Sequence, residues 1–411
     1  MAVIRPFCAV RPAVEYADKV AALPYDVYNR AEAKKEVERE PLSFLAIDRA
    51  ETQFEDSVSV YAPEVYAKAK ELFEERISQG IFVEDKQSAY YIYQLEMNGR
   101  TQTGIAACAS VDDYLDGTIK KHENTREEKE QDRIRHVDTL SAQTGPIFLA
   151  YRSQATINQL VSKIMETQEP LYDFVAADGI AHRMWKVTEE AVTTLQEAFA
   201  GIQEIYIADG HHRAASAVKV GLKRRKEHPD YDGTEEFNYF LSVLFPDDQL
   251  MIMDYNRCVK DLHGLTKEAF LKAVEECFDV TVLDGAKHPQ AKGQITMYLE
   301  NRWYLLQAKQ ELLAITDPVA ALDVSLLQEY LLKPVLGIED PRTDERIDFI
   351  GGIRGLEELE RRVQTDMTVA FAMYPTSIGE LFAVADAGLL MPPKSTWFEP
   401  KLRSGLLMHR I

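Results

Sequence analysis

The sequence predicts an α+β protein (mixed α/β, with mixed sheets), and three observations lead to this class. Short apolar runs typical of strands alternate with charged segments of helical period along the whole chain. Asn98-Gly99 and Asp178-Gly179 stand between paired strand-like runs, as hairpin turns do. No glycine- or serine-rich linker and no low-complexity segment cuts the chain.

The expected elements follow in chain order. Pro6 interrupts an apolar run at 4–10, which favours an edge strand. A helix rich in Ala, Glu, Lys and Leu ends at Gly80. Up to residue 260 we expect a helix at 63–79, a hairpin of 89–97 and 103–111, a charged helix at 123–140 stopped by Gly145-Pro146, a buried strand at 146–151, a hairpin of 175–180 and 181–187, a strand at 204–208, a helix at 214–225 and a strand at 240–245.

Beyond residue 260 the same reasoning predicts helices at 265–277, 319–335 and 377–388, a hairpin of 294–299 and 303–308, and strands at 348–353 and 368–374. We divide the chain into three regions: an N-terminal α/β region at 1–165, a core segment at 166–260 and a C-terminal α/β region at 261–411.

Composition narrows the class of function. The 411 residues include 47 Lys+Arg and 67 Asp+Glu, so the net charge is −20, which disfavours binding to nucleic acids and to anionic membranes. The four cysteines show no metal-binding spacing and are interpreted as reduced thiols. Without a visible secretory signal or an apolar run of about 20 residues, we expect a cytoplasmic protein. Whether it forms a homo-oligomer stays open.

The sharpest local feature is the segment EIYIADGHHRAASAVKV, a strand that runs through a turn into a helix. The N-terminus of a helix attracts anions through its unpaired N–H groups and its dipole. Gly210 allows a sharp turn, Arg213 offers a planar fork for phosphate oxygens, and His211 and His212 titrate near neutrality. Asp209 could orient an imidazole, cap the helix or bind a metal. Two alternatives stay open: a simple Asp cap among surface polar residues, and a zinc site, which lacks a third ligand nearby.

A second cluster is KHENTREEKEQDRIRH, in which Lys129, Asp132 and Arg133 fall on one side of the expected helix. Thr125 and Glu128 have capping-box spacing, so His122 and Glu123 would precede the helix. The alternative is a solvated charged helix.

Two further segments carry candidates. Asp26 follows Pro24-Tyr25 and is either functional or a turn residue. Lys394 lies in the segment MPPKSTWFEPKL, which either contacts phosphate or packs its aromatic residues in the core. The signatures of P-loop enzymes, dinucleotide-binding folds, serine hydrolases, zinc proteases and protein kinases are absent from the sequence.

These motifs together resemble a bacterial and archaeal family of unknown function in the ParB/sulfiredoxin-like superfamily. The resemblance rests on RPFCAVRP, LPYDV, KHENTREEKEQDRIRH, TGPIFLAY, IADGHHRAASA and MPPKSTWFEPKL, and so spans the chain. It implies a ParB/sulfiredoxin-like nucleotide-binding core, in which a strand–loop–helix element cradles nucleotide phosphates. Histidines replace the cysteine that sulfiredoxins carry in this loop, which disfavours sulfinic acid reduction.

The superfamily includes free-serine kinases, so the resemblance implies transfer of a phosphoryl group from ATP or ADP, with Mg²⁺, to L-serine. Asp209, Gly210, His211, His212 and Arg213 would bind phosphate, with Asp209 as the metal ligand. The implied catalytic residues are His212 and a base, for which Asp26 and Glu123 are both candidates. Arg126 and Lys394 would stabilise the transferring group. Hydrolysis of O-phosphoserine, nucleotide binding without catalysis, and metal-dependent hydrolysis by His122, His211 and His212 are the alternatives.

Overall fold

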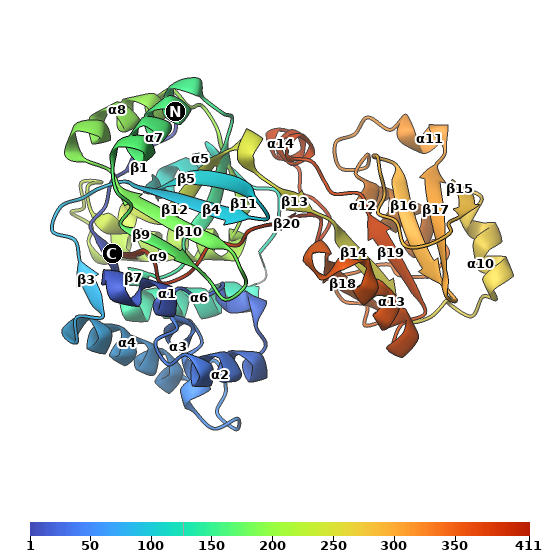
Figure 1. Ribbon diagram of the computed structural model, residues 1–411, viewed down its shortest axis with the longest axis horizontal. Helices are drawn as coiled ribbons and strands as arrows, with labels where there is room; N and C mark the ends of the chain where they lie inside the picture. Colours follow the sequence, from blue (N-terminus) through green and yellow to red (C-terminus); the bar gives the residue numbers. More distant parts are fainter. Residues whose placement is uncertain (126) are drawn as a thin grey trace. The chain divides into compact units, whose positions relative to one another are not determined.

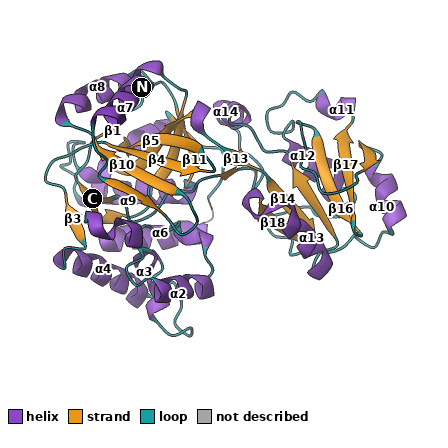
Figure 2. Ribbon diagram, in the orientation of Figure 1, coloured by secondary structure: helices purple, strands orange, loops and turns teal. Residues whose placement is uncertain are grey.

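The computed structural model describes residues 1–125 and 127–411, and its chain forms two compact units. One unit comprises residues 1–250 and 400–411, and the other comprises residues 251–399 (Figure 1). Figure 2 shows strands and helices in both units, and the predicted α+β class is confirmed. Strands from both 1–165 and 166–260, which the sequence treats as separate regions, share one sheet in the first unit.

That large sheet is mixed. Its central pairs combine the parallel pairing of β8 with β12 and the antiparallel pairing of β5 with β4 and β12. In spatial order its strands are β6 (Ile119–Lys120), β11 (Ile205–Asp209), β8 (Ile147–Tyr151), β12 (Tyr239–Pro246), β5 (Arg100–Ser110), β4 (Tyr91–Met97), β10 (Ala181–Lys186) and β9 (Tyr172–Val175), and β1 (Ile4–Arg5) also pairs with β5. A smaller sheet in the same unit contains β3 (Phe82–Glu84), β2 (Ala9–Pro12), β21 (Met408–Arg410) and β7 (Ala142–Gln143).

The predicted hairpins form where the turn residues favour them. Asn98 and Gly99 adopt φ of 54° and 76°, the left-handed conformation that a tight two-residue turn requires, and they join β4 to β5. Gly179 has φ of 80° in the turn between β9 and β10.

The helices of this unit lie on both sides of the large sheet, with α7 and α8 on one side and α2, α3 and α4 on the other (Figure 1). They are α1 (Ala17–Val20), α2 (Arg30–Arg39), α3 (Leu45–Asp48), α4 (Pro63–Ser78), α5 (Val111–Asp116), α6 (Glu127–Leu140), α7 (Ala155–Thr167), α8 (Glu189–Ala200) and α9 (His211–Glu227). No helix among the described residues is long and apolar enough to cross a membrane.

Two of these helices begin at residues that differ from the sequence prediction. Residues 123–125 are not helical, so the predicted start of α6 at residue 123 is wrong, and Glu123 lies in the segment before the helix. Helix α9 begins at His211 rather than at residue 214, because Gly210 adopts φ of 96° and turns the chain directly from strand to helix. The histidines are therefore part of the first helical turn.

An apolar core holds the strand–helix turn in place. Ile205 and Ile207 of β11 are fully buried in one cluster with Ala214 and Ala217 of α9. These alanines are the small residues that let α9 approach the sheet closely. Ser216 adds a hydroxyl that donates to the Glu130 carbonyl of α6 at 3.1 Å. Gly210 thus sets the turn, and the small residues Ala214 and Ala217 allow α9 to lie close to the sheet.

The second unit contains an antiparallel sheet covered by short helices. In spatial order its strands are β15 (Phe278–Val282), β17 (Arg302–Ala308), β16 (Gln294–Leu299), β19 (Val369–Met373), β14 (Tyr255–Val259) and β18 (Ile347–Gly351), and β13 (Ile252–Met253) pairs separately with β20 (Trp397–Phe398). Its helices are α10 (Lys267–Val274), α11 (Gln310–Leu313), α12 (Asp323–Leu327), α13 (Gly355–Thr365) and α14 (Ile378–Asp386). The predicted helix at 319–335 is broken: α12 continues into a π-helix, Gln328–Leu332.

Candidate functional site

The candidate site is the turn between β11 and α9. Strand β11 pairs with β6 at its start, through Ile205 and Tyr206, and with β8 up to Asp209 at its end. His211, His212 and Arg213 then occupy the first turn of a 17-residue helix. Because the first N–H groups of an α-helix lack intrahelical acceptors, this turn has the properties of an anion site.

Asp209 closes β11 and forms an ion pair with Lys401, whose Nζ lies 3.1 Å from Oδ2. Burial would raise the pKa of Asp209, but the charges of Lys401 and Arg213 hold that pKa well below its usual value. The carboxylate is therefore ionised and paired near neutral pH. The C-terminal segment contains both Lys394 and Lys401, and sequence reasoning chose Lys394, since nothing in the local sequence marks Lys401 as the partner of Asp209.

Two buried histidines stand beside the turn. The rings of His122 and His211 meet edge to face, with centroids 4.5 Å apart and an interplanar angle of 88°. The backbone N–H of His122 donates to Nε2 of His211 at 3.5 Å, and Nδ1 of His211 lies 3.8 Å from a Glu123 carboxylate oxygen. Burial, and then the neighbouring His122, lower the pKa of His211 well below its usual value.

His122 is 2% exposed, and burial lowers its pKa to about 4, although Asp209 and the Ile207 carbonyl favour its charged form. Its Nδ1 has no hydrogen-bond partner among the described residues. A buried polar atom without a partner usually marks a place where water or a ligand binds.

We expect His122 to make the protein less stable in acid. The pKa of His122 is about 4 in the folded chain against 6.5 for the ordinary side chain. The stability that the neutral side chain contributes is therefore complete above pH 6.5 and is lost as the pH falls to about 4. The free energy of unfolding should fall by about 3 kcal/mol between pH 7.5 and pH 4 on this account. Urea unfolding of wild type and His122→Gln across this range measures it, and equal pH slopes in the two proteins would contradict it.

Arg213 is fixed against the turn itself. One Nη1 hydrogen bond goes to the Pro146 carbonyl, just before β8. A Cβ atom at Gly210 would lie 3.1 Å from both Nε and Nη2 of Arg213, so the guanidinium is packed directly over the glycine. Gly145 borders its other side, at 3.6 Å by the same measure. Gly145 and Gly210, which lie on two different loops, thus leave space for the Arg213 guanidinium.

The other predicted residues take different places. His212 is half-buried. Burial would raise the pKa of Glu130, but Lys219, Thr125 and then His212 lower it. Arg126 lies outside the described residues. Lys394 belongs to the unit 251–399, where its carbonyl accepts a hydrogen bond from Arg257 at 3.1 Å.

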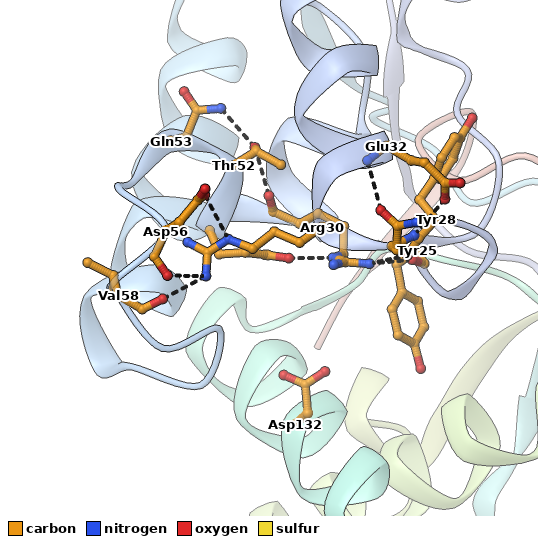
Figure 3. A network of polar contacts seen from close by, with 12 residues as sticks. Tyr25, Tyr28, Arg30, Glu32, Thr52, Gln53, Asp56, Val58 and Asp132 are labelled. Atoms are coloured by element: carbon orange, nitrogen blue, oxygen red, sulfur yellow. Dashed lines mark hydrogen bonds and ion pairs between the residues drawn. The ribbon is translucent and has the colours of Figure 1, made fainter. Parts of the chain in front are cut away.

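Asp26 lies in a short 3₁₀ helix, Tyr25–Val27, and its side chain is exposed. Arg49 holds this segment from both ends: its Nη1 donates to the carbonyls of Tyr25 (3.0 Å) and Tyr28 (2.6 Å). Figure 3 shows this network, with Arg30 bound to the carbonyl of Val58 at 2.8 Å. The carboxylate is therefore presented from an anchored loop, and Arg49 is a contributor that sequence patterns did not indicate.

Two adjoining cavities connect these parts. Arg213 lines one of them and Asp26 lines the other, and four residues border both: Tyr25, Asp48, Arg133 and His136. Asp26 and Arg213 thus line two neighbouring cavities of the first unit. Glu123 lines neither cavity but contacts His211.

No cluster of three or more His, Cys, Asp or Glu side chains suited to a metal ion occurs within residues 1–125 and 127–411. The rings of His122 and His211 meet edge to face instead of converging on a point. The zinc interpretation therefore finds no ligand set in the described part of the chain.

Comparisons with known proteins give a family and some distant structural likenesses. No curated protein matches the chain. Among solved structures, free serine kinase in complex with AMP is 14% identical and covers 74% of this chain and 92% of its own, with a TM-score of 0.35. A conserved hypothetical protein from Pyrococcus furiosus is 14% identical (74% of this chain, 94% of its own, TM-score 0.35). SbnI with C-terminal truncation, from Staphylococcus aureus, is 11% identical (73% and 85%, TM-score 0.39).

Residues 4–325 match the family described as protein of unknown function, DUF1015. This match takes in the Tyr25–Val27 segment, α6 and the turn between β11 and α9, and it spans well over half of the 411 residues. The chain belongs to the DUF1015 family.

Proposed function

We propose that this protein transfers a phosphoryl group between a nucleotide and a small hydroxy amino acid, and that it acts as a kinase of free L-serine that forms O-phospho-L-serine. The observation that supports it best is the β11–α9 turn, where a helix N-terminus, the Arg213 guanidinium and a buried histidine with an unpaired nitrogen come together. Such a turn suits phosphate oxygens. The choice of serine follows from the sequence resemblance.

In this proposal the turn acts by electrostatics. Phosphoryl transfer needs positioning and stabilisation of charge on the transferring group more than covalent chemistry. The N–H groups of the first turn of α9 and the guanidinium of Arg213 would hold the phosphate oxygens. The ion pair with Lys401 would keep Asp209 from repelling them. His211 stays neutral and so would serve as a hydrogen-bonding group.

The base that accepts the serine hydroxyl proton would be Asp26. It is exposed in a cavity that adjoins the one lined by Arg213, and its loop is anchored by Arg49. A carboxylate is a weak base for an alcohol, so alignment must supply much of the rate acceleration. Glu123 is the second candidate, through its contact with His211.

Magnesium would enter with the nucleotide. Asp209 is the one carboxylate of the turn, and its Oδ2 is bound to Lys401, so the protein offers few ligands. Mg²⁺ commonly binds through nucleotide phosphates and one or two carboxylates, which fits this arrangement. Bound there, it would neutralise phosphate charge.

The proposal is tested by incubating the protein with ATP, ADP or pyrophosphate, with Mg²⁺ and with serine, threonine or homoserine, and following phosphorylated amino acid and free phosphate together. Phosphoserine formed from a nucleotide supports it. Free phosphate released from O-phosphoserine alone would show a phosphatase. Nucleotide binding without any product would show a regulator.

Replacing His212 by Ala is expected to abolish phosphoryl transfer and to leave the fold intact, because this half-buried side chain stands in the first turn of α9. Initial rates measured with saturating nucleotide check this, with circular dichroism for the fold. His228→Ala at the exposed far end of the same helix is the matched control and should keep the wild-type rate. Full activity in His212→Ala would count against the site.

A further inference from the structure

One face of α6 lines the cavity that contains Asp26. Lys129, Asp132, Arg133 and His136 occupy positions i, i+3, i+4 and i+7, so they follow one side of the helix. The sequence had marked the first three as one side of a charged helix, and the structure turns that side towards a cavity. The proposed chemistry uses none of these four residues.

The lining carries both signs of charge. Its acidic members are Asp26, Asp48, Glu51 and Asp132, and its basic members are Arg49, Lys129 and Arg133. Four carboxylates disfavour a phosphate group here, and three cations disfavour a purely cationic ligand. The β11–α9 turn differs, since Arg213 and Lys401 both act on its carboxylate, Asp209. The turn therefore suits an anion, whereas the cavity suits a ligand that carries charges of both signs.

Asp48 is the buried anion of this cavity. It is 5% exposed, and its Oδ1 accepts a hydrogen bond from Thr144 (2.9 Å) and lies 3.4 Å from Nε2 of His136. Burial would raise the pKa of Asp48, but His136, Arg133 and Thr144 hold it below its usual value, so the carboxylate is charged.

Arg133 is the buried cation beside it. It is 7% exposed, and its guanidinium lies 4.0 Å from the centroid of the Tyr25 ring. The Asp132 carboxylate accepts a hydrogen bond from Nε of Arg133 (2.9 Å) and forms an ion pair with its Nη2 (2.8 Å). The Tyr66 hydroxyl donates to the same carboxylate at 2.8 Å. One edge of the fork is thus fixed, and Nη1 remains for a ligand.

We propose that this cavity is a subsite for a small zwitterion, with the ammonium group on Asp48 and the carboxylate on Arg133. The inference rests on the proposed function, which it deepens: the phosphoryl acceptor must carry both an amino and a carboxyl group. The subsite leaves the substrate hydroxyl to Asp26, which lines the same cavity. It also adjoins the cavity of Arg213, through the shared residues Tyr25, Asp48, Arg133 and His136.

The test is calorimetric titration of the full chain, with and without ADP, using L-serine, L-glycerate (no ammonium) and ethanolamine (no carboxylate). We expect L-serine to bind and each analogue to bind at least about tenfold more weakly, since each lacks a charged hydrogen bond. L-glycerate binding as tightly as L-serine, or no binding of L-serine at all, would overturn the subsite.

Two variants locate the binding. Asp48→Asn and Arg133→Lys should each weaken L-serine by about 10- to 100-fold and leave the Kd of ADP within about twofold. Glu127→Gln, an exposed residue at the start of α6 that does not line this cavity, is the control and should change neither Kd. If Asp48→Asn fails to fold, Arg133→Lys carries the test, because it keeps the charge and loses the fork. Unchanged L-serine binding in the folded variants would contradict the proposal.

The titrations separate this inference from the proposed function. L-serine binding that depends on Asp48 and Arg133, without phosphoryl transfer from any donor, would refute the function and support the subsite. Phosphoserine formation with the KM for serine unchanged in both variants would support the function and refute the subsite.

Discussion

Arg213→Ala is expected to lower kcat/KM for phosphoryl transfer by about 100- to 1,000-fold, the range seen when one positioned donor to a developing charge is removed. The reason is the place of the guanidinium, which is packed over Gly210 at the N-terminus of α9. It also weakens the repulsion that phosphate would meet from Asp209, whose pKa it helps to lower. Steady-state kinetics with varied nucleotide measure the effect.

Arg213 also bonds to the Pro146 carbonyl, so its loss has a structural component that must be separated. Arg213→Lys keeps the charge without the planar fork and should fall between wild type and Arg213→Ala. Arg183→Ala is the matched control, because Arg183 forms ion pairs with Glu96 and Asp173 on strands away from the turn. The prediction is wrong if Arg213→Ala and Arg183→Ala have equal activity.

Gly210→Ala should impair the site through two separate effects. The residue has φ of 96°, which costs a residue with a Cβ atom about 1–2 kcal/mol. Its Cβ would also lie 3.1 Å from Nε and Nη2 of Arg213 and would displace the guanidinium. We expect a lowered melting temperature together with a loss of activity of at least about tenfold, since small misplacements of positioned groups have large effects on rate.

Gly179→Ala separates the two effects. Gly179 has φ of 80° in the β9–β10 turn, and a Cβ there would meet nothing within 4 Å. It should share the backbone strain of Gly210→Ala and so lower the melting temperature by a similar amount, while its kinetics stay normal. Equal kinetic losses in the two variants would mean that strain, rather than the position of Arg213, explains the result.

Much of the fold could be predicted from local sequence, because its signals are local. Asn98-Gly99 and Asp178-Gly179 fix their hairpins through glycine conformations that few other residues adopt. The turn at Gly210 was likewise visible, since strand, glycine and helix follow directly in sequence. The start of α9 was placed three residues late because polar residues such as His211 show no helical apolar pattern, although their backbone is helical.

The rest of the site depends on contacts between residues distant in sequence. Lys401 reaches Asp209 across 192 positions, and Thr144 reaches Asp48 across 96. Asp48 itself stands in the short helix α3 with no motif around it, so no pattern could mark it as part of a cavity. Such residues become visible only when the chain is folded.

The most direct measurement is the electron density of ADP in crystals of the protein soaked with the nucleotide and Mg²⁺. We predict the terminal phosphate at the start of α9, within hydrogen-bonding distance of the backbone N–H groups of His212 and Arg213 and of the Arg213 guanidinium. Nucleotide bound elsewhere on the chain, or no nucleotide at saturating concentration, would contradict the assignment of this turn as a phosphate site.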